Sequence, residues 1–289
     1  MTNNLYIPLT KRAAIQISGK DSKQFLQGLI TNDINKVDDD KVIYALMLTP
    51  QGKFLYDFFI AHREGAYLLD CQKELLPQII KKLSMYKLRS DVQIEDVSQK
   101  YEIAALLGDK VFEVMEGREN NVRQFCKGVA YIDPRNDKIF ARSFIEIDND
   151  YQSFKAFDFE LGAFDDYEYA RINACVPEGG VDLESGGAFP HDFGMDSLNA
   201  VDYNKGCYVG QEVTARVHHK GNVRKRLYVI ESDEENKLLL GQEVTFEDEK
   251  IGTVFSAIKN IALAVLIQEK VEKNNFVCNV NDMKIKVRK

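Results

Sequence analysis

The sequence has few cysteines, and their spacing excludes several kinds of site. An odd number of widely separated thiols without a C-x-x-C pair argues against a disulfide framework and against a self-contained zinc or iron–sulfur site. We therefore expect a protein of a reducing compartment that has no metal site of its own. The five cysteines are Cys71, Cys126, Cys175, Cys207 and Cys278.

Long apolar runs and an excess of positive charge are also missing. The longest aliphatic run, at 261–267, is too short to span a bilayer, and the N-terminal residues show neither an apolar signal segment nor an Arg-rich presequence. The formal net charge of −7 argues against general binding to nucleic-acid backbones, although 220–226 forms a local basic run. These absences predict a bacterial cytosolic protein that binds neither membranes nor nucleic acids.

The composition is that of an ordinary globular protein, with 45% hydrophobic and 29% charged residues. Alternation and turn residues predict an early strand, turn and helix, then a β-meander at 41–71 and, after it, a helix with Pro77 in its first turns. A single helix is expected at 153–172. The Gly- and Pro-rich segment 173–204 is long for a structureless loop, and such loops are often functional. Short strands after 226 predict a small antiparallel barrel.

The densest stretch of chemistry is "NKGCYVGQEVTARVHH", at 204–219. Cys207 lies between two glycines and after Lys205, where a turn with free N–H groups and a following helix would favour a reactive thiolate. The alternative is a small buried hydrophobic residue in a Gly-rich turn. His218 and His219 are adjacent, so they cannot easily face one metal, and they are interpreted as surface or supporting residues.

Four further positions are candidates from the residues alone. Alternation in "QGKFLYDFFIAH" can place Asp57 inside a pocket, where a carboxylate needs a partner or a function; an exposed edge position is the alternative. Asn32 follows the first helix and is typical of a C-cap. Arg171 and Glu178 bracket the long loop, and from the residues alone they are best explained as surface charges.

Taken together, three stretches resemble one superfamily. "ISGKDSKQFLQGLITNDI", "LTPQGKFLYDFFI" and "KGCYVGQEVTARVHHKGNVRKRL" are similar to the folate-binding YgfZ and glycine-cleavage T-protein superfamily. Lys-Gly-Cys-Tyr-x-Gly-Gln-Glu resembles the signature of its YgfZ branch, which takes part in iron–sulfur protein maturation. The extended late motif and "VPEGGVDL" are most similar to the mitochondrial-type, Iba57-like subgroup.

The resemblance implies an α+β fold of three domains around a central hole that holds tetrahydrofolate. The first domain would be discontinuous, at 1–41 and 146–225, around a ferredoxin-like second domain at 42–145, with a C-terminal β-barrel at 226–289. It also implies a tetrahydrofolate-binding accessory factor for assembly, maturation or repair of [4Fe–4S] proteins. Its partners would be iron–sulfur carrier or scaffold proteins and [4Fe–4S] apoproteins.

Site residues carry over from the resemblance one by one. Cys207 and Asp57 would carry the chemistry, and Cys207 could share a transient iron–sulfur cluster with a partner. The folate-binding set would comprise Asn32, Asp57, Arg171, Lys205 and Gln211, with Lys205 near the carboxylates of the folate tail.

One segment departs from the T-protein pattern. The T-protein Arg-x-Glu-x-Gly segment is here Arg171-Ile172-Asn173-Ala174-Cys175. Loss of the glutamate and the glycine weakens the case for aminomethyl transfer, which remains the alternative function. A non-enzymatic adaptor is a third hypothesis, and the sequence does not decide whether the protein is an enzyme.

Overall fold

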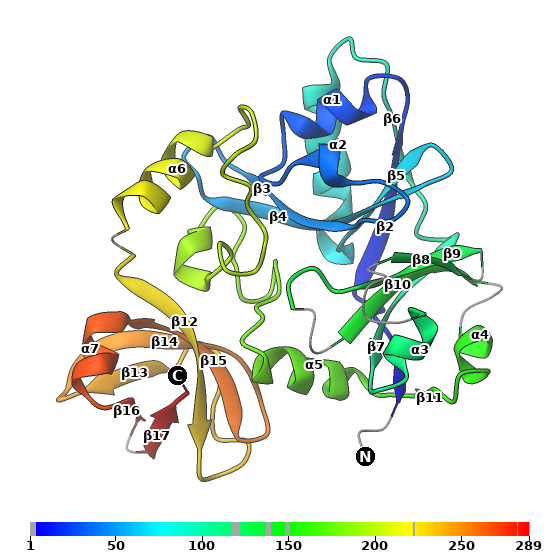
Figure 1. Cartoon of the computed structure of the whole chain (residues 1–289). Helices are drawn as coiled ribbons and strands as arrows, with labels where there is room; N and C mark the ends of the chain where they lie inside the picture. The colour runs from blue at the N-terminus through cyan, green and yellow to red at the C-terminus, as the bar shows by residue number, and fades with distance from the viewer. Residues whose placement is uncertain are drawn as a thin grey trace.

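The strands form two open sheets and one closed barrel (Figure 1). This computed structural model describes residues 4–116, 122–125, 127–136, 140–147, 151–221, 223–281 and 283–288. Cys126, one of the five cysteines on which the redox expectation depends, lies outside these residues. The α+β class and the C-terminal barrel expected from the sequence are both confirmed.

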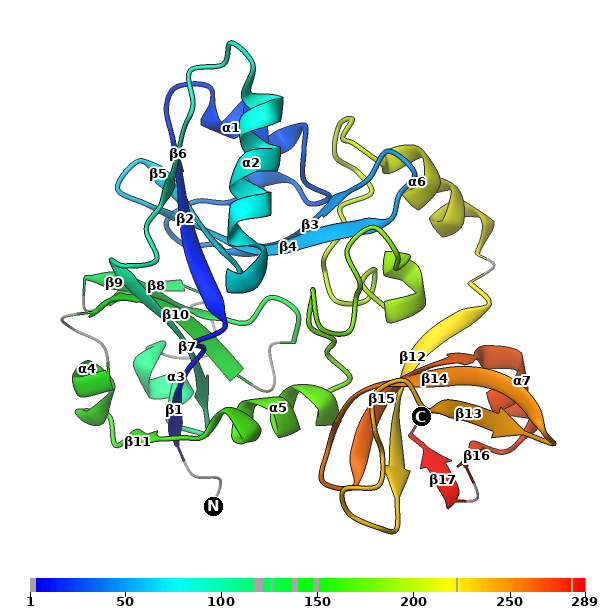
Figure 2. The same ribbon diagram turned by 180° about the vertical axis from the view of Figure 1, so that it is seen from behind.

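The first sheet has five strands in the order β3-β4-β5-β2-β6. Two helices, α1 (Ser22–Gln27) and α2 (Leu76–Lys87), cover one of its faces (Figures 1 and 2). The expected position of Pro77 in the first turn of α2 is confirmed. The strands are β2 (Arg12–Ser18), β3 (Ile43–Leu48), β4 (Phe54–Arg63), β5 (Ala66–Gln72) and β6 (Gln93–Asp96).

The second sheet has six strands in the order β11-β1-β7-β10-β9-β8. Its outer face packs on α3 (Val111–Val114) and α4 (Tyr151–Lys155). The strands are β1 (Leu5–Pro8), β7 (Tyr101–Leu107), β8 (Val122–Phe125), β9 (Gly128–Ile132), β10 (Phe140–Glu146) and β11 (Glu160–Leu161).

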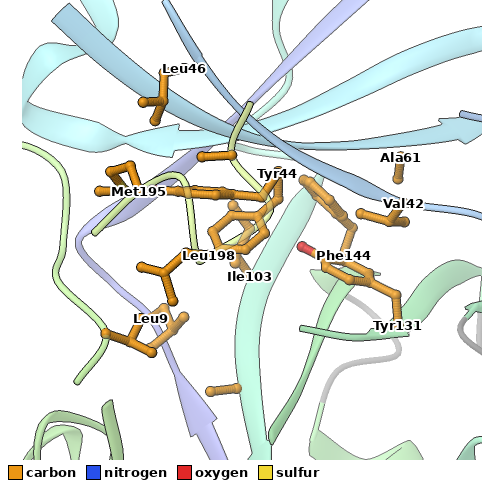
Figure 3. Close-up of a cluster of buried hydrophobic side chains, with 14 of the residues drawn as sticks. Leu9, Val42, Tyr44, Leu46, Ala61, Ile103, Tyr131, Phe144, Met195 and Leu198 are labelled. Atoms are coloured by element: carbon orange, nitrogen blue, oxygen red, sulfur yellow. Dashed lines mark hydrogen bonds between the residues drawn. The ribbon is translucent and has the colours of Figure 1, made fainter. Parts of the chain in front are cut away.

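The two open sheets pack against each other, and strand β3 shows why. Every residue of β3 is buried, because its side chains alternate between two apolar layers. Ile43 and Ala45 point toward the layer under the helices, whereas Tyr44 and Leu46 point toward the layer shared with the second sheet. Figure 3 shows this shared layer, which includes Tyr44 of β3 and Phe144 of β10. The inter-sheet layer holds the candidate site.

The strand pairing crosses the domain boundary expected at residue 42, and the domain division itself stays a prediction. Range 42–145 was expected to form one domain, but β3, β4 and β5 belong to the first sheet, and β7, β9 and β10 belong to the second. Segment 1–41 supplies β1 to one sheet and β2 to the other. Strand β2 pairs with both β5 and β6, and such long-range partners cannot be read from local alternation.

The single helix expected at 153–172 is wrong. The chain forms α4, then the short strand β11, and then α5 (Phe164–Asn173). Strand β11 pairs in parallel with β1, and Gly162 passes so close that an added Cβ would lie 2.7 Å from Ile7 Cγ1. Edge pairing and this close approach override the helical pattern.

The barrel begins at Lys225, one residue before the expected boundary. Its strands follow the closed order β12-β15-β14-β13-β16-β17, and α5 contacts β14 and β15. No helix in the described part of the chain is long and apolar enough to cross a membrane. The elements are β12 (Lys225–Ser232), β13 (Glu243–Phe246), β14 (Glu249–Ile258), β15 (Ile261–Ile267), α7 (Gln268–Lys273), β16 (Val277–Val280) and β17 (Met283–Val287).

Candidate functional site

Charged side chains from both sheets meet in the layer between them. Asp70 of β5 is fully buried, and its two carboxylate oxygens accept hydrogen bonds from different arginines. Arg12 Nε of β2 donates to Oδ1 at 2.5 Å, and Arg142 Nη2 of β10 donates to Oδ2. Because a buried charge must be paired, Asp70 joins the two sheets electrostatically.

Asp57 and Glu178 belong to the same cluster. The side chain of Asp57 is 2% exposed, its Oδ1 lies 3.6 Å from Arg12 Nη1, and its Oδ2 accepts a hydrogen bond from Tyr44 Oη at 2.9 Å. Glu178, from the long loop, accepts from Arg12 Nη1 at 2.9 Å and from Tyr167 Oη at 3.0 Å. The interior position expected for Asp57 is therefore confirmed. Glu178 is not the surface charge of the sequence interpretation.

The two carboxyl groups beside Arg12 differ in their pKa values. Burial raises the pKa of Asp57, and Arg12 only partly offsets that effect. Burial also acts to raise the pKa of Glu178, but Arg12 and Arg135 outweigh it and lower that pKa to about 2. Glu178 is therefore the ionised partner, and Asp57 is the carboxyl group better able to hold a proton.

A cavity of about 690 Å³ borders this cluster. Its buried side includes Tyr44 and Arg135, which are 0% and 3% exposed. The Arg135 guanidinium lies 5.4 Å from the Tyr44 ring centroid, so a cation and an aromatic ring stand together at one end. Other lining residues are Asn32, Lys36, Lys41, Asn136, Ser197 and Asn199. The volume is in the range that holds small organic ligands.

Of the residues expected to bind folate, Asn32 lines this cavity. Its amide nitrogen donates to the carbonyl oxygens of Tyr44 and Asn199, at 2.8 Å each. Asp57 is separated from the cavity by Tyr44, with which it shares a hydrogen bond. The expected folate contact of Asp57 would therefore be indirect.

Arg171 has a different environment from the one expected. It is fully buried, and its guanidinium pairs with Glu168 and with Asp182, the latter at 2.9 Å. It also donates to Ser256 Oγ of β14 at 2.8 Å, so it links α5, the long loop and the barrel. These contacts favour a structural role for Arg171 over a ligand contact.

Lys205 is also occupied by protein contacts. Its ammonium donates to the carbonyl oxygens of Gln27, Ile30 and Asn32, at 2.8, 2.6 and 2.9 Å. An ammonium has three donors, so none remains for the carboxylates of a folate tail in this conformation. Gln211, the last of the expected set, is partly exposed at the first position of α6 (Gln211–Lys220).

The turn that carries Cys207 packs against the β3–β4 hairpin. Gly210 has φ of +85°, and a Cβ there would lie 2.6 Å from Thr49 O, so only glycine fits without a shift. From the hairpin, Gly52 also approaches α6 closely, and a Cβ there would lie 2.8 Å from Val213 Cβ. Figures 1 and 2 both show α6 beside this end of the hairpin. The two motifs "TPQGK" and "KGCYVGQE" therefore form one structural unit, and the helix expected after the turn is confirmed.

Cys207 itself is exposed, whereas Cys71 and Cys278 are buried and Cys175 is intermediate. It is thus the one exposed thiol among the four described cysteines. The alternative interpretation of Cys207, as a small buried hydrophobic residue, is therefore wrong. The His218 ring stacks on Tyr203, with 3.6 Å between centroids, and meets the His219 ring edge-on. No group of three or more His, Cys, Asp or Glu side chains in the described ranges could hold a metal ion.

Four charged residues of the cluster were not predicted from the sequence: Arg12, Asp70, Arg135 and Arg142. All four are at least 93% buried. A usable signal existed in β2 and β10, where an arginine stands in a mostly apolar strand, as in "RAAIQI" and "FARSFI". A charge at an inward position of such a strand predicts a buried partner, although the partner's identity depends on which strands pair.

Two family models match the chain. Residues 7–139 match the GCVT N-terminal domain, and residues 224–289 match the CAF17 C-terminal beta-barrel domain. The first match covers strands of both open sheets, and the second covers the closed barrel.

Three curated relatives that match most of this chain carry the name IBA57. The iron-sulfur cluster assembly factor IBA57, mitochondrial, of Mus musculus is 33% identical over 236 residues, which cover 77% of this chain and 64% of that protein. The homolog from Mycosarcoma maydis is 32% identical over 233 residues, covering 75% and 54%. The human protein is 29% identical over 281 residues, covering 91% and 78%.

The chain thus spans between about half and two-thirds of the fungal and mouse proteins. The names of all three relatives place those proteins in mitochondria. The bacterial cytosolic location expected from the sequence therefore stays a prediction.

A solved structure shares the fold. The glycine cleavage system aminomethyltransferase T from Bartonella henselae superposes with a TM-score of 0.77 at 12% identity, covering 100% of this chain and 86% of that one. Family models, relatives and fold agree. The chain joins a GCVT-type N-terminal domain to a CAF17-type C-terminal β-barrel, and over most of its length it is similar to the IBA57 iron–sulfur cluster assembly factors.

Proposed function

We propose that this protein is an accessory factor for the assembly, maturation or repair of [4Fe–4S] proteins. The similarity to IBA57 proteins supports this role, and the observation that carries it is the exposed thiol of Cys207 on a tightly packed turn. One thiolate cannot hold a cluster alone. The cluster would be cargo, shared with the thiolates of an iron–sulfur carrier, scaffold protein or apoprotein.

The test is restoration of function in cells that lack their own factor of this type. Expression of the whole chain should restore the activity of [4Fe–4S] enzymes, measured against an enzyme that needs no cluster. Equal activities with the chain and with an empty vector, at matched protein levels, would contradict the proposal.

We infer that the 690 Å³ cavity binds tetrahydrofolate. The fit rests on its volume, on the aromatic ring of Tyr44 beside the buried guanidinium of Arg135, and on Lys36 and Lys41, which are exposed and suit a carboxylate-bearing tail. Asn32 and Tyr44 would border the ring system, and the lysines would meet the glutamate tail. Bound there, tetrahydrofolate would supply one-carbon chemistry.

Replacing Lys41 by Glu tests this inference. The charge reversal should weaken binding of tetrahydrofolate polyglutamate by about fivefold, the equivalent of roughly 1 kcal/mol for an exposed charge contact, and should weaken the monoglutamate less. Titration calorimetry at low salt measures both. The control Lys81→Glu changes an exposed lysine on α2, which does not line the cavity. Equal losses in the two variants would count against the cavity.

The geometry around Asp57 does not favour aminomethyl transfer. Asp57 is 2% exposed, and Gly179 packs on it so closely that an added Cβ would lie 2.6 Å from its carboxyl carbon. A catalytic carboxyl group must reach the reacting atoms. The enclosure of Asp57 therefore supports the assembly role over the transferase alternative.

A further inference from the structure

Lys205 fastens the Cys207 turn to the end of helix α1. Lys205 is 7% exposed, and its ammonium donates to three carbonyl oxygens in the segment 27–32, which begins at the last residue of the helix. These carbonyl groups have no N–H partner further along a helix, and a cation near a helix C-terminus is favourable. The contact spans more than 170 residues of sequence and fixes one side of the turn.

The other side of the turn is fixed as well. The Val209 amide donates to Gly28 O at 3.3 Å, and Gly210 packs against Leu48 and Thr49 of the hairpin. Cys207 lies between these anchors with its side chain exposed. The position of the thiol is therefore set by contacts two residues away on each side.

The same segment forms part of the cavity wall. Asn32 lines the cavity, and its carbonyl oxygen accepts the hydrogen bond from Lys205. Asn199 and Val201, in the strand-free loop that leads to Lys205, line it too, and Asn199 O accepts from the Asn32 amide. A ligand in the cavity would contact both chain segments that Lys205 holds together.

We propose that Lys205 is a positioning residue that couples occupation of the cavity to the order of the Cys207 turn. A reduced folate in the cavity stabilises segment 27–32 and the loop 197–205, and the ammonium transmits that order to the turn. The coupling is reciprocal, so a partner that binds and orders the turn also tightens ligand binding by the same factor. This inference rests on the proposed folate site.

The Lys205 ammonium lies in a largely buried environment with charged and aromatic neighbours. Desolvation by burial lowers the pKa of Lys205 to about 8, while Asp33 and Asp202 oppose the shift. Of the other charged groups near it, Lys36 pairs with Asp202 at 2.7 Å. Tyr208, whose ring centroid lies 5.0 Å from the ammonium, covers it.

Amide hydrogen exchange at Val209 tests the proposal in the full chain. Without ligand, Lys205→Met should lower the protection factor of this amide by about tenfold or more, and Lys205→Arg, which keeps the charge, should recover part of the loss. Saturating tetrahydrofolate should raise protection at least about fivefold in the native chain, as expected for typical coupling, and should leave it unchanged in Lys205→Met. The control Lys23→Met alters an exposed lysine on α1 itself and should match the native chain in both states.

Calorimetry on the same samples separates the possible failures. If tetrahydrofolate binds but Val209 protection rises equally in the native chain and in Lys205→Met, Lys205 is only structural and the proposal is overturned. Absence of tetrahydrofolate binding to the native chain overturns the cavity assignment and the coupling together. The ligand-free comparison still decides the positioning role, because unchanged protection in Lys205→Met would overturn that role regardless of folate.

Discussion

Replacing Asp70 by Asn is expected to lower the free energy of unfolding by about 3–5 kcal/mol, because it breaks a buried ion pair by removing one partner. Asp70 is fully buried, and each of its carboxylate oxygens accepts from a different guanidinium. An asparagine offers one oxygen and turns its amino group toward a donor. The positive charges of Arg12 and Arg142 would then be balanced by less negative charge, in a buried site where water cannot replace the lost hydrogen bond.

Urea denaturation of the two proteins measures the difference. The matched control is Asp233→Asn, which removes a carboxylate that is 90% exposed and lies 3.6 Å from Lys286. That change should alter stability by less than about 0.5 kcal/mol, since exposed ion pairs contribute little. A loss below about 1 kcal/mol in Asp70→Asn would mean that Asp70 is not what holds the two guanidinium groups between the sheets.

Replacing Cys207 by Ser should abolish the restoration of [4Fe–4S] enzyme activity in cells that lack their own factor. The thiol is exposed, so the change removes a thiolate ligand or nucleophile without removing packing. A hydroxyl does not ionise near neutral pH and is a poor ligand for iron in clusters. The thermal midpoint of the purified variant should stay within about 2 °C of the native chain, because the change is at the surface.

The matched control removes a different thiol. Cys175 is partly buried, and its sulfur donates weakly to Leu227 O at 3.8 Å. Cys175→Ser at the same expression level should restore the enzymes as the native chain does. Full restoration by Cys207→Ser would exclude any chemical role for the thiol and would leave the turn as a docking surface at most.

The sequence predicts local structure in this protein better than it predicts the cluster at its centre. Alternation and turn residues that lie close together in the chain predict four elements correctly: the β-meander, the helix with Pro77, the helix after the Cys207 turn and the barrel. The burial of Asp57 follows from the same alternation. The helix expected at 153–172 was wrong, because the long-range pairing of β11 with β1 decided the structure of that segment. The domain division at residue 42 stays a prediction, although β2 pairs with β5 across it.

Lys205 and Arg171 show a second limit. Both were expected to meet a ligand, and both are occupied by atoms of the protein itself. A lysine beside a glycine-rich turn gives the same pattern whether its ammonium faces a carboxylate or a row of carbonyl groups. Only the fold brings the end of α1 to Lys205, and the partner is about 175 residues away.

The division of the first two strands between the sheets has a consequence for how the chain can fold as it is synthesised. Strand β2 can pair with β5 as soon as β5 has left the ribosome. Strand β1 emerges first, but its two partners are β7 and, much later in the chain, β11 at Glu160–Leu161. The beginning of the chain must therefore wait for more than half of the protein. Non-local pairing of this kind slows folding, and until β11 arrives the edge of β1 stays open to other strands, which makes a nascent-chain chaperone most useful in that interval.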